Sequence, residues 1–213
     1  MNLLLLYPEE ISKELASDDP RALHVRDILK AQSGDRLKVG VMGGRIGTAQ
    51  VEWTEGGRLQ FSHFEIQENP PPPLPLSLII GTPRPPTARR LLRDLTSLGV
   101  GKLHWTSSEL GERSYLHSPL WVGGEWRLEM LLGAMQGRTT LMPHIEWSEK
   151  FHRVFEKQWP EKRFYLSPGG SAWPRERLES AVVAVGPERG FTVEETARLE
   201  REGFAPLSLG PMT

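Results

Sequence analysis

A glycine-rich loop near the C-terminal end carries the strongest chemical signal in this chain. Residues 186–191 read Gly-Pro-Glu-Arg-Gly-Phe and follow Ala181–Val185, an apolar run with β-branched side chains that predicts a buried strand. Thr192 and Glu195 then form a capping box, which predicts the start of a helix. Such a loop exposes backbone N–H and C=O groups that can hold a ligand. The same spacing also suits a simple tight turn.

A second loop of the same character, residues 207–211 (Leu-Ser-Leu-Gly-Pro), follows another short strand. Arginines gather elsewhere, and the segment before Asp94 contains Arg84, Arg89, Arg90 and Arg93. A solvated helix face explains that cluster without any ligand. Arg113, Arg127 and Arg138 are each typical of a protein surface, but together with a small β-rich module they indicate phosphate or RNA contacts.

The N-terminal part of the chain predicts a small, mostly β module. Residues 20–31 suit one short helix, and residues 36–41 and 47–53 are strand-like segments that flank a Met-Gly-Gly-Arg turn. Residues 58–64 continue the strand pattern. The proline-rich run 69–75 then locks the backbone, which predicts a stiff spacer rather than a helix or a central strand. We therefore expect domains at residues 1–69 and 76–213, joined by a linker at 70–75.

From residue 76 onwards, strands alternate with helices. We expect strands at 76–80, 100–105, 163–167 and 181–185, and helices at 87–98, 125–136 and 193–202. Alternation of this kind predicts an α/β domain with a mostly parallel sheet covered by helices. Ligands of open α/β sheets bind beyond the carboxyl ends of the strands. The loops after Leu166, Val185 and Leu209 all lie at such ends.

Composition narrows the function. A net charge of −1 means that any nucleic-acid site must come from a local patch. Without cysteine the chain has no disulfide and no thiolate ligand, and no apolar run reaches the ~18–20 residues that cross a bilayer. The first ten residues lack a basic segment and a long apolar run, so no secretory signal is predicted. We expect a cytoplasmic protein without a membrane segment.

Several reaction classes are disfavoured by missing motifs. The histidines lack the spacing of metal ligands, so no metal site is predicted; they are His24, His63, His104, His117, His144 and His152. A Gly-x-Ser-x-Gly nucleophile elbow is also missing. Neither a Walker loop nor a Gly-x-Gly-x-x-Gly fingerprint follows a strand, which disfavours nucleoside triphosphates and dinucleotides.

Short motifs along nearly the whole chain carry a resemblance to one family. They are His24 with Ile28-Leu29-Lys30, Gly34-Asp35, Leu98-Gly99-Val100, Arg113-Ser114, residues 134–138 (Ala-Met-Gln-Gly-Arg), residues 186–191 with Glu194, and residues 207–210. Their order and spacing resemble the 16S ribosomal RNA (uracil-N3)-methyltransferases of the RsmE type, within the trefoil-knotted SPOUT class.

The resemblance implies a PUA-like RNA-binding barrel at residues 1–69, a knotted domain at 76–213, and a homodimer. It also implies that S-adenosyl-L-methionine methylates N3 of a uridine in 16S ribosomal RNA or the small ribosomal subunit, as a step of ribosome biogenesis. The implied cofactor-binding residues are Leu166, Ser167, Pro168, Gly169, Gly186, Pro187, Glu188, Gly190, Leu207, Leu209, Gly210 and Met212. A further helix beyond Thr213 is implied as well.

No residue is identified as the catalytic base, and positioning of the two reactants is the expected source of catalysis. Arg138 and Glu188 are candidates for shaping the catalytic pocket. The expected RNA contacts are His24, Arg26, Lys30, Arg113, Arg127 and Arg138. The reactive uridine must present its Watson–Crick edge, so an unpaired or extruded base is expected.

The chain departs from the family pattern at three positions. Arg189 replaces a family glycine, which would strain the backbone if that position needs positive φ. Lys30 replaces an arginine, and Met212 a basic residue. The departure at Arg189 leaves open an alternative, an RNA-binding or ribosome-assembly protein with impaired catalysis. A weaker alternative is a SPOUT methyltransferase acting on transfer RNA.

Overall fold

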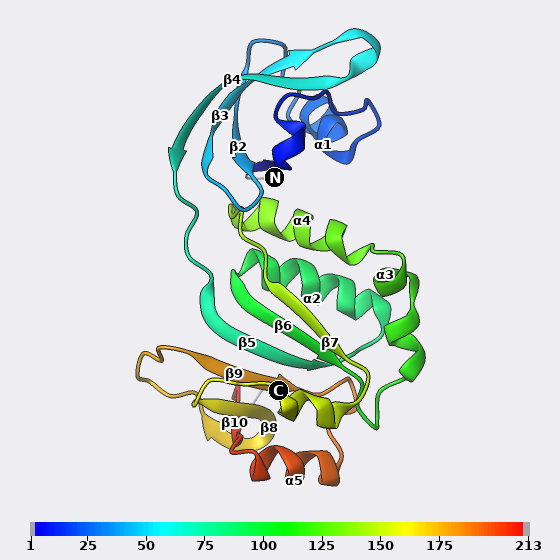
Figure 1. Cartoon of the computed structure of the whole chain (residues 1–213), viewed down its shortest axis with the longest axis vertical. Coiled ribbons are helices and arrows are strands. Elements are labelled where there is room, and N and C mark those ends of the chain that lie inside the picture. The colour runs from blue at the N-terminus through cyan, green and yellow to red at the C-terminus, as the bar shows by residue number, and fades with distance from the viewer. Residues whose placement is uncertain (1–2, 211–213) are drawn as a thin grey trace. The chain divides into compact units, whose positions relative to one another are not determined.

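The computed structural model describes residues 3–210 and divides the chain into two compact units (Figure 1). The first unit contains Met1–Pro72, Thr96–Gly99 and Met130–Met142. The second contains Pro73–Leu95, Val100–Glu129 and Pro143–Thr213. Each unit has a sheet of its own, and each is described separately below.

The first unit contains a four-stranded sheet in the order β1-β2-β3-β4. Its strands are β1 (Leu4–Leu6), β2 (Arg36–Val41), β3 (Ile46–Trp53) and β4 (Leu59–Glu68). The predicted hairpin of β2 and β3 is confirmed, because the two strands pair antiparallel. The pattern analysis missed β1, which pairs parallel with β2 and buries all three of its leucines.

The predicted N-terminal helix is shorter than expected. Helix α1 (Pro20–Leu23) starts at its N-cap Asp19 and continues as a π-helical turn, His24–Ile28. Ala22 and Val25 point into an apolar core that includes Val51, Leu59 and Phe61. A second core in the same unit joins Leu3, Leu5 and Ile46 to the end of α4 (Trp126–Gly137).

The second unit contains a six-stranded sheet in the order β10-β8-β9-β5-β6-β7, and every pairing in it is parallel. The predicted parallel α/β sheet is therefore confirmed. Its strands are β5 (Leu74–Gly81), β6 (Val100–Thr106), β7 (His144–Ser148), β8 (Arg163–Ala172), β9 (Ala181–Val185) and β10 (Ala205–Ser208).

The helices of this sheet follow the predicted positions closely. Helix α2 (Pro85–Ser97) ends before Gly99, whose φ of 78° is the left-handed value that favours glycine at a helix end. Helix α5 (Val193–Arg201) starts with the predicted capping box of Thr192 and Glu195. Its Leu199 packs into the core with Val182 and Ala184 of β9. A short helix, α3 (Pro119–Val122), was not predicted.

Two strand predictions need correction. The proline run was expected to exclude a central strand, but β5 begins at Leu74 and includes Pro75. The register of β5 against β6 shifts between Leu74 and Ser77, so Pro75 lies where the ladder is already interrupted. The predicted loop after Leu166 belongs to β8, whose register against β10 jumps between Pro206 and Leu207. Residues 166–170 bulge at that jump.

Candidate functional site

The loop after β9 is fixed by close backbone contacts. A Cβ on Gly81, at the end of β5, would approach the ring of Pro187 to 2.6 Å, so only glycine fits there. Gly186 is restricted in the same way by Gly190, whose backbone would lie 2.8 Å from an added Cβ. The carboxyl ends of β5 and β9 are neighbours in the sheet. The sequence therefore folds this loop tightly onto the end of β5.

Glu188 anchors the loop from its other side. Its carboxylate accepts a hydrogen bond of 3.1 Å from the backbone N–H of Arg84, and it lies 3.6 Å from Nε of the same arginine. Arg84 lies in the segment between β5, which ends at Gly81, and α2. The contacts of Glu188, a candidate catalytic residue, therefore include a structural one, which holds together the loops that follow β5 and β9.

Arg189 does not carry the strain that the sequence suggested. The positive φ of this loop belongs to Gly190, at 75°, and Arg189 is not among the residues with positive φ. Nothing lies within 4 Å of a Cβ added to Gly190, so its backbone faces open space. The glycine that the loop conformation needs is thus present, and Arg189 is an exposed neighbour.

The other two predicted cofactor loops lie together on β8 and β10. Gly170 approaches Leu207 so closely that an added Cβ would come within 2.5 Å of its backbone nitrogen. Strand β8 pairs with β9 over Arg163–Tyr165, and its later residues pair with β10. Gly169 and Gly210 face open space, as Gly190 does. Leu166, Ser167, Pro168 and Leu209 flank these glycines, and Met212 lies outside the described residues.

At Gly169, Gly190 and Gly210 no atom lies within 4 Å of the position that a Cβ would take, so a ligand can approach the backbone closely there. The N–H of Gly190 donates to the carbonyl of Pro187 at 2.8 Å and that of Gly210 to the hydroxyl of Ser208 at 3.1 Å, which fixes both turns. The loops therefore fit a small ligand at the carboxyl ends of β8, β9 and β10.

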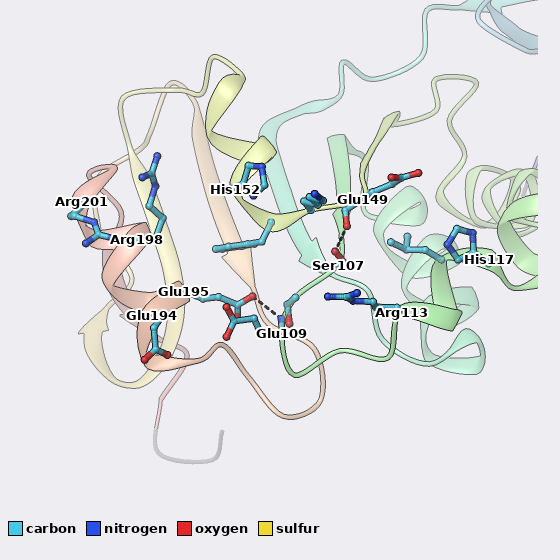
Figure 2. A pocket seen from close by; sticks show the side chains of 14 residues that line it. Ser107, Glu109, Arg113, His117, Glu149, His152, Glu194, Glu195, Arg198 and Arg201 are labelled. Carbon is cyan, nitrogen blue, oxygen red and sulfur yellow. Dashed lines mark hydrogen bonds between the residues drawn. The ribbon is translucent and has the colours of Figure 1, made fainter.

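A polar cavity of about 670 Å³ opens at the carboxyl ends of β6 and β7 (Figure 2). We call it the polar pocket. Its lining comes from the segments after these two strands, from the 3-10 helix Arg113–His117 and from α5. The lining residues are Ser107, Ser108, Glu109, Arg113, Leu116, His117, Glu149, Lys150, Phe151, His152, Glu194, Glu195, Arg198 and Arg201.

Glu195 holds two walls of the polar pocket together. Only 4% of its surface is exposed, and its carboxylate accepts hydrogen bonds from the backbone N–H of Glu109, at 2.9 Å, and of Thr192, at 3.0 Å. The hydroxyl of Ser107 donates to the backbone carbonyl of Glu149, which joins the segments after β6 and β7. In Figure 2, Glu195 and Arg113 reach toward the same space from opposite walls.

Cations without a protein partner face this cavity. Among the described residues, the side chains of Arg113, Lys150 and Arg201 form no ion pair, whereas Arg198 pairs with Glu202 at 2.6 Å. The hydroxyl of Ser108 is buried and has no hydrogen-bond partner in the described part of the chain. Buried polar groups nearly always find a partner, so this hydroxyl points to an external one. Cations with a free donor suit an anionic ligand such as phosphate.

A charged cluster supports the strand that leads into the pocket. Glu146 of β7 lies 3.0 Å from Nζ of Lys102 and 3.2 Å from Nδ1 of His104. Partial burial raises the pKa of Glu146, but the hydrogen bond and charge of Lys102 and the charge of Lys157 outweigh it and lower the pKa to about 2. Burial lowers the pKa of His104, whose Nε2 lies 2.8 Å from the hydroxyl of Ser148. These contacts hold the end of β7 in place, immediately before Glu149, which lines the pocket.

The predicted RNA contacts fall in both units. Arg113 lines the polar pocket, and the guanidinium of Arg127 lies 4.4 Å from the ring centre of Trp126. In the first unit, the buried Nε2 of His24 has no partner among the described residues, and burial lowers the pKa of this histidine. Arg26 pairs with Asp27 at 2.9 Å.

Two predicted contacts in the first unit have an unusual backbone. Lys30 and Arg138 have positive φ values of 54° and 55°, which side chains other than glycine rarely adopt. Arg138 is the first residue after α4, and the N–H of Thr139 donates back to the carbonyl of Ala134 at 3.1 Å. Strained positions of this kind cluster at functional sites.

Sequence reasoning missed several residues of the polar pocket. Ser108, Lys150, His152 and Arg201 carry no motif, and they meet only because β6, β7 and α5 end at the same edge. A weak signal for β7 existed, since Ile145 and Trp147 alternate with polar residues as in a half-buried strand.

Between residues 3 and 210, no group of acidic residues and histidines is arranged to hold a metal ion. Within the same range, no helix is long and apolar enough to cross a membrane.

Comparisons with known proteins agree on one family. The RNA methyltransferase domain family matches residues 70–213. Ribosomal RNA small subunit methyltransferase E 1 of Borreliella burgdorferi is 29% identical over 219 residues, which cover all of this chain and 91% of the relative. Ribosomal RNA small subunit methyltransferase E of Treponema pallidum is 31% identical over 229 residues, covering all of this chain and 85% of the relative.

Solved structures share the fold. A ribosomal RNA small subunit methyltransferase E from Neisseria gonorrhoeae, bound to S-adenosylmethionine, matches with a TM-score of 0.74 and 20% identity, covering 99% of this chain and 89% of that one. A Legionella pneumophila protein in complex with the same cofactor matches with a TM-score of 0.76 and 17% identity, covering 99% and 90%. Because the domain match spans most of the sequence and the Treponema relative aligns with all of it, the chain belongs to the RsmE-type RNA methyltransferase family.

Proposed function

We propose that this protein is an S-adenosylmethionine-dependent methyltransferase that methylates N3 of a uridine in 16S ribosomal RNA. Membership of the RNA methyltransferase family supports the reaction class. The names of the relatives support the small-subunit RNA as substrate. The neighbours that hold S-adenosylmethionine support the donor.

The observation that carries the proposal is the loop from Gly186 to Gly190. It leaves the carboxyl end of β9, its conformation depends on the close approach of Pro187 to Gly81, and its Gly190 backbone is open. When bound, S-adenosylmethionine supplies an electrophilic methyl group. The loop N–H and C=O groups orient that donor, together with the backbone at 166–169 and 207–210. The proposed donor residues are Leu166, Ser167, Pro168, Gly169, Gly186, Pro187, Glu188, Gly190, Leu207, Leu209 and Gly210.

The acceptor atom explains what the protein must do with the RNA. N3 of uridine lies on the Watson–Crick edge and carries a proton, so the base has to be unpaired before it reacts. The protein holds that base against the donor and accepts or relays its proton. Glu188 is a candidate for shaping this site, because its carboxylate lies at the rim of the loop. Arg138 is the second candidate.

We further infer the RNA contacts and the assembly. Arg113 and Arg127 of the second unit, and His24, Arg26, Lys30 and Arg138 of the first, contact phosphates of the substrate. The N-terminal sheet acts as a PUA-like RNA-binding domain, the second unit has the SPOUT trefoil knot, and the protein works in the cytoplasm as a homodimer. Light scattering coupled to size exclusion tests the dimer, because a monomeric mass would contradict it.

Methyl transfer from labelled S-adenosylmethionine is the direct test. Small subunits from a strain that lacks the modification should accept label, and mass spectrometry of the digested RNA should identify N3-methyluridine. Failure of the small subunits to accept label would contradict the proposed substrate. Label that appears in transfer RNA instead would establish the alternative SPOUT activity, and RNA binding without any label would establish the impaired protein.

A glycine pair provides the matched control for donor binding. Gly190 and Gly203 both have positive φ, at 75° and 82°, and both face open space. Valine strains either backbone to a similar degree. Calorimetry should therefore detect loss of S-adenosylmethionine binding in Gly190→Val and normal binding in Gly203→Val. Equal binding by both variants would contradict the role of the loop.

A further inference from the structure

A second cavity, of about 470 Å³, lies at the edge of the sheet of the second unit. We call it the tryptophan pocket. Its strand is β7, the last strand of that sheet. It shares Leu116, His117 and Glu149 with the polar pocket, so the two cavities are contiguous. The remaining lining residues are Trp121, Val122, Trp126, Arg127, Trp147 and Ser148.

The tryptophans hold one another in a fixed geometry. The ring of Trp147 meets Trp121 and Trp126 edge to face, with ring centres 6.0 Å and 5.4 Å apart. Trp121 in turn lies 4.8 Å from the fully buried Trp105 of β6. Trp147 is nevertheless 42% exposed. The result is a rigid aromatic ring that is anchored at its edge and open to a ligand.

A cation is held over Trp126, the neighbour of Trp147. The guanidinium of Arg127 lies 4.4 Å from the ring centre of Trp126 and forms no ion pair with any described residue. A Cβ on Gly124 would come within 2.7 Å of Nη1 of Arg127, so glycine leaves room for this position. Arg127 is exposed, which leaves its donors available to a phosphate.

Two further polar groups belong to residues that line the pocket. Nε1 of Trp121 is buried and has no hydrogen-bond partner among the described residues. Glu149 contributes an exposed side chain to the wall that both pockets share. An exposed aromatic ring, an exposed cation and an exposed acceptor together suit an unpaired nucleotide. An apolar partner would leave Arg127 without a counter-charge.

We propose that the tryptophan pocket binds an unpaired base of the RNA substrate, stacked on Trp147, with its phosphate on Arg127. This inference rests on the proposed RNA methyltransferase function. The base is a neighbour of the methylated uridine, because β7 is three strands away from β9, the strand that carries the Gly186 loop. At ~4.8 Å per strand that separation is about 14 Å, too far for methyl transfer to a base in the tryptophan pocket.

Tryptophan fluorescence tests the stacking directly, with Trp173 as the matched control. Trp173 is 44% exposed, packs in a tilted geometry against the ring of Phe164, and lies outside both pockets. The probes are oligouridine, oligoadenosine and the same oligomers without bases. Base-containing probes should quench the fluorescence of the wild type and of Trp173→Ala, and baseless probes should not.

Trp147→Ala should lose that quenching and bind the oligomers about tenfold more weakly, which is a typical effect of removing a stacked aromatic ring. Trp147→Phe, which keeps a stacking ring, should restore most of the affinity and guards against misfolding of the alanine variant. Equal affinities of Trp147→Ala, Trp147→Phe and Trp173→Ala, or quenching by baseless probes, would overturn the proposal.

These outcomes separate the inference from the proposed function. If the wild type transfers no methyl group but Trp147 still stacks bases, the proposed reaction fails and the pocket stands. If the wild type methylates ribosomal RNA and Trp147→Ala binds as tightly as the control, the pocket fails and the reaction stands.

Discussion

Arg21 in the first unit and Arg113 in the second illustrate two uses of one side chain. Arg21 is 7% exposed and donates to Glu10 at 2.7 Å, to Asp19 at 2.8 Å and to the carbonyl of Leu5 at 2.9 Å. Burial lowers the pKa of Arg21, but hydrogen bonds with both carboxylates more than compensate and raise it. Every donor direction of this arginine ends on a protein acceptor.

Arg113 is not surrounded by protein acceptors in this way. Its side chain is exposed, lines the polar pocket and forms no ion pair with a described residue. Lys150 and Arg201 face the same cavity in the same state. A closed charge cluster holds elements together, whereas an open one keeps its donors for a ligand. The number of satisfied donors, rather than the residue type, separates a structural arginine from a binding one.

The largest effect is expected from opening the closed cluster. Arg21→Ala leaves Glu10 and Asp19 without their shared cation, and removing one partner of a buried ion pair costs about 3–5 kcal/mol. The free energy of unfolding, measured by urea titration, should fall by that amount. Arg36→Ala is the control, because the Arg36–Glu65 pair is exposed and should contribute less than about 1 kcal/mol. Equal losses of unfolding free energy in Arg21→Ala and Arg36→Ala would contradict the structural role of Arg21.

Glu146 tests whether a fully paired charge cluster also stabilises the second unit. Its carboxylate is surrounded by Lys102, His104 and Lys157, the reverse in sign of the Arg21 cluster. Glu146→Gln should destabilise the protein by about 1.5–3 kcal/mol at neutral pH, because hydrogen bonds to a charged group are lost.

The pH dependence gives this prediction its sign. The pKa of Glu146 falls from 4.5 to about 2 on folding, so its contribution is complete above pH 4.5 and is lost as the pH falls towards 2. The difference in melting temperature between wild type and Glu146→Gln should therefore shrink below pH 4.5. Wild type and variant both contain Glu10 and Asp19, so the pH dependence that these carboxylates contribute cancels in the difference. A gap that stays constant from pH 6 to pH 3 would contradict the assignment.

Arg113→Ala should leave stability unchanged and weaken RNA binding about tenfold, the typical loss for a hydrogen bond to a charged group. The slope of log affinity against log salt should also decrease by roughly one phosphate contact. Arg90→Ala is the control, because Arg90 is an exposed arginine of the same unit that does not line the pocket. A loss of stability in Arg113→Ala, with unchanged RNA affinity, would mean that Arg113 is a structural arginine like Arg21.

The smallest effect is expected at Arg189. The change Arg189→Gly introduces the glycine that the family resemblance implies, but the backbone at residue 189 lacks a positive φ that glycine would relieve. Donor affinity by calorimetry should therefore change less than about threefold, and stability by less than about 0.5 kcal/mol. A large gain in affinity would mean that the side chain of Arg189 obstructs the loop.

The second unit could be predicted from sequence where the local signals agreed. The apolar run of β9 and the capping box of α5 were both placed correctly, because each depends on neighbouring residues. Strand β1 was missed because its three leucines lack β-branched residues and alternation, and it forms only by pairing with β2 across the intervening chain. Pro75 misled the prediction, because a register shift tolerates it inside β5.

The site divides in the same way. The Gly186 loop and Arg113 could be found from motifs. Ser108, Lys150 and the tryptophan pocket could not, because strand order brings them together and no short motif encodes strand order. The backbone angles were also needed to show that the positive φ of this loop belongs to Gly190 and not to residue 189.

The exposed position of Arg189 has a practical use. The chain contains no cysteine, so Arg189→Cys would create a single thiol beside the Gly186 loop. An environment-sensitive dye attached there would report arrival of a small molecule at this turn in real time. Because residue 189 is exposed and lacks a positive φ, a cysteine with its label should leave the turn intact, and one reporter would follow ligand exchange.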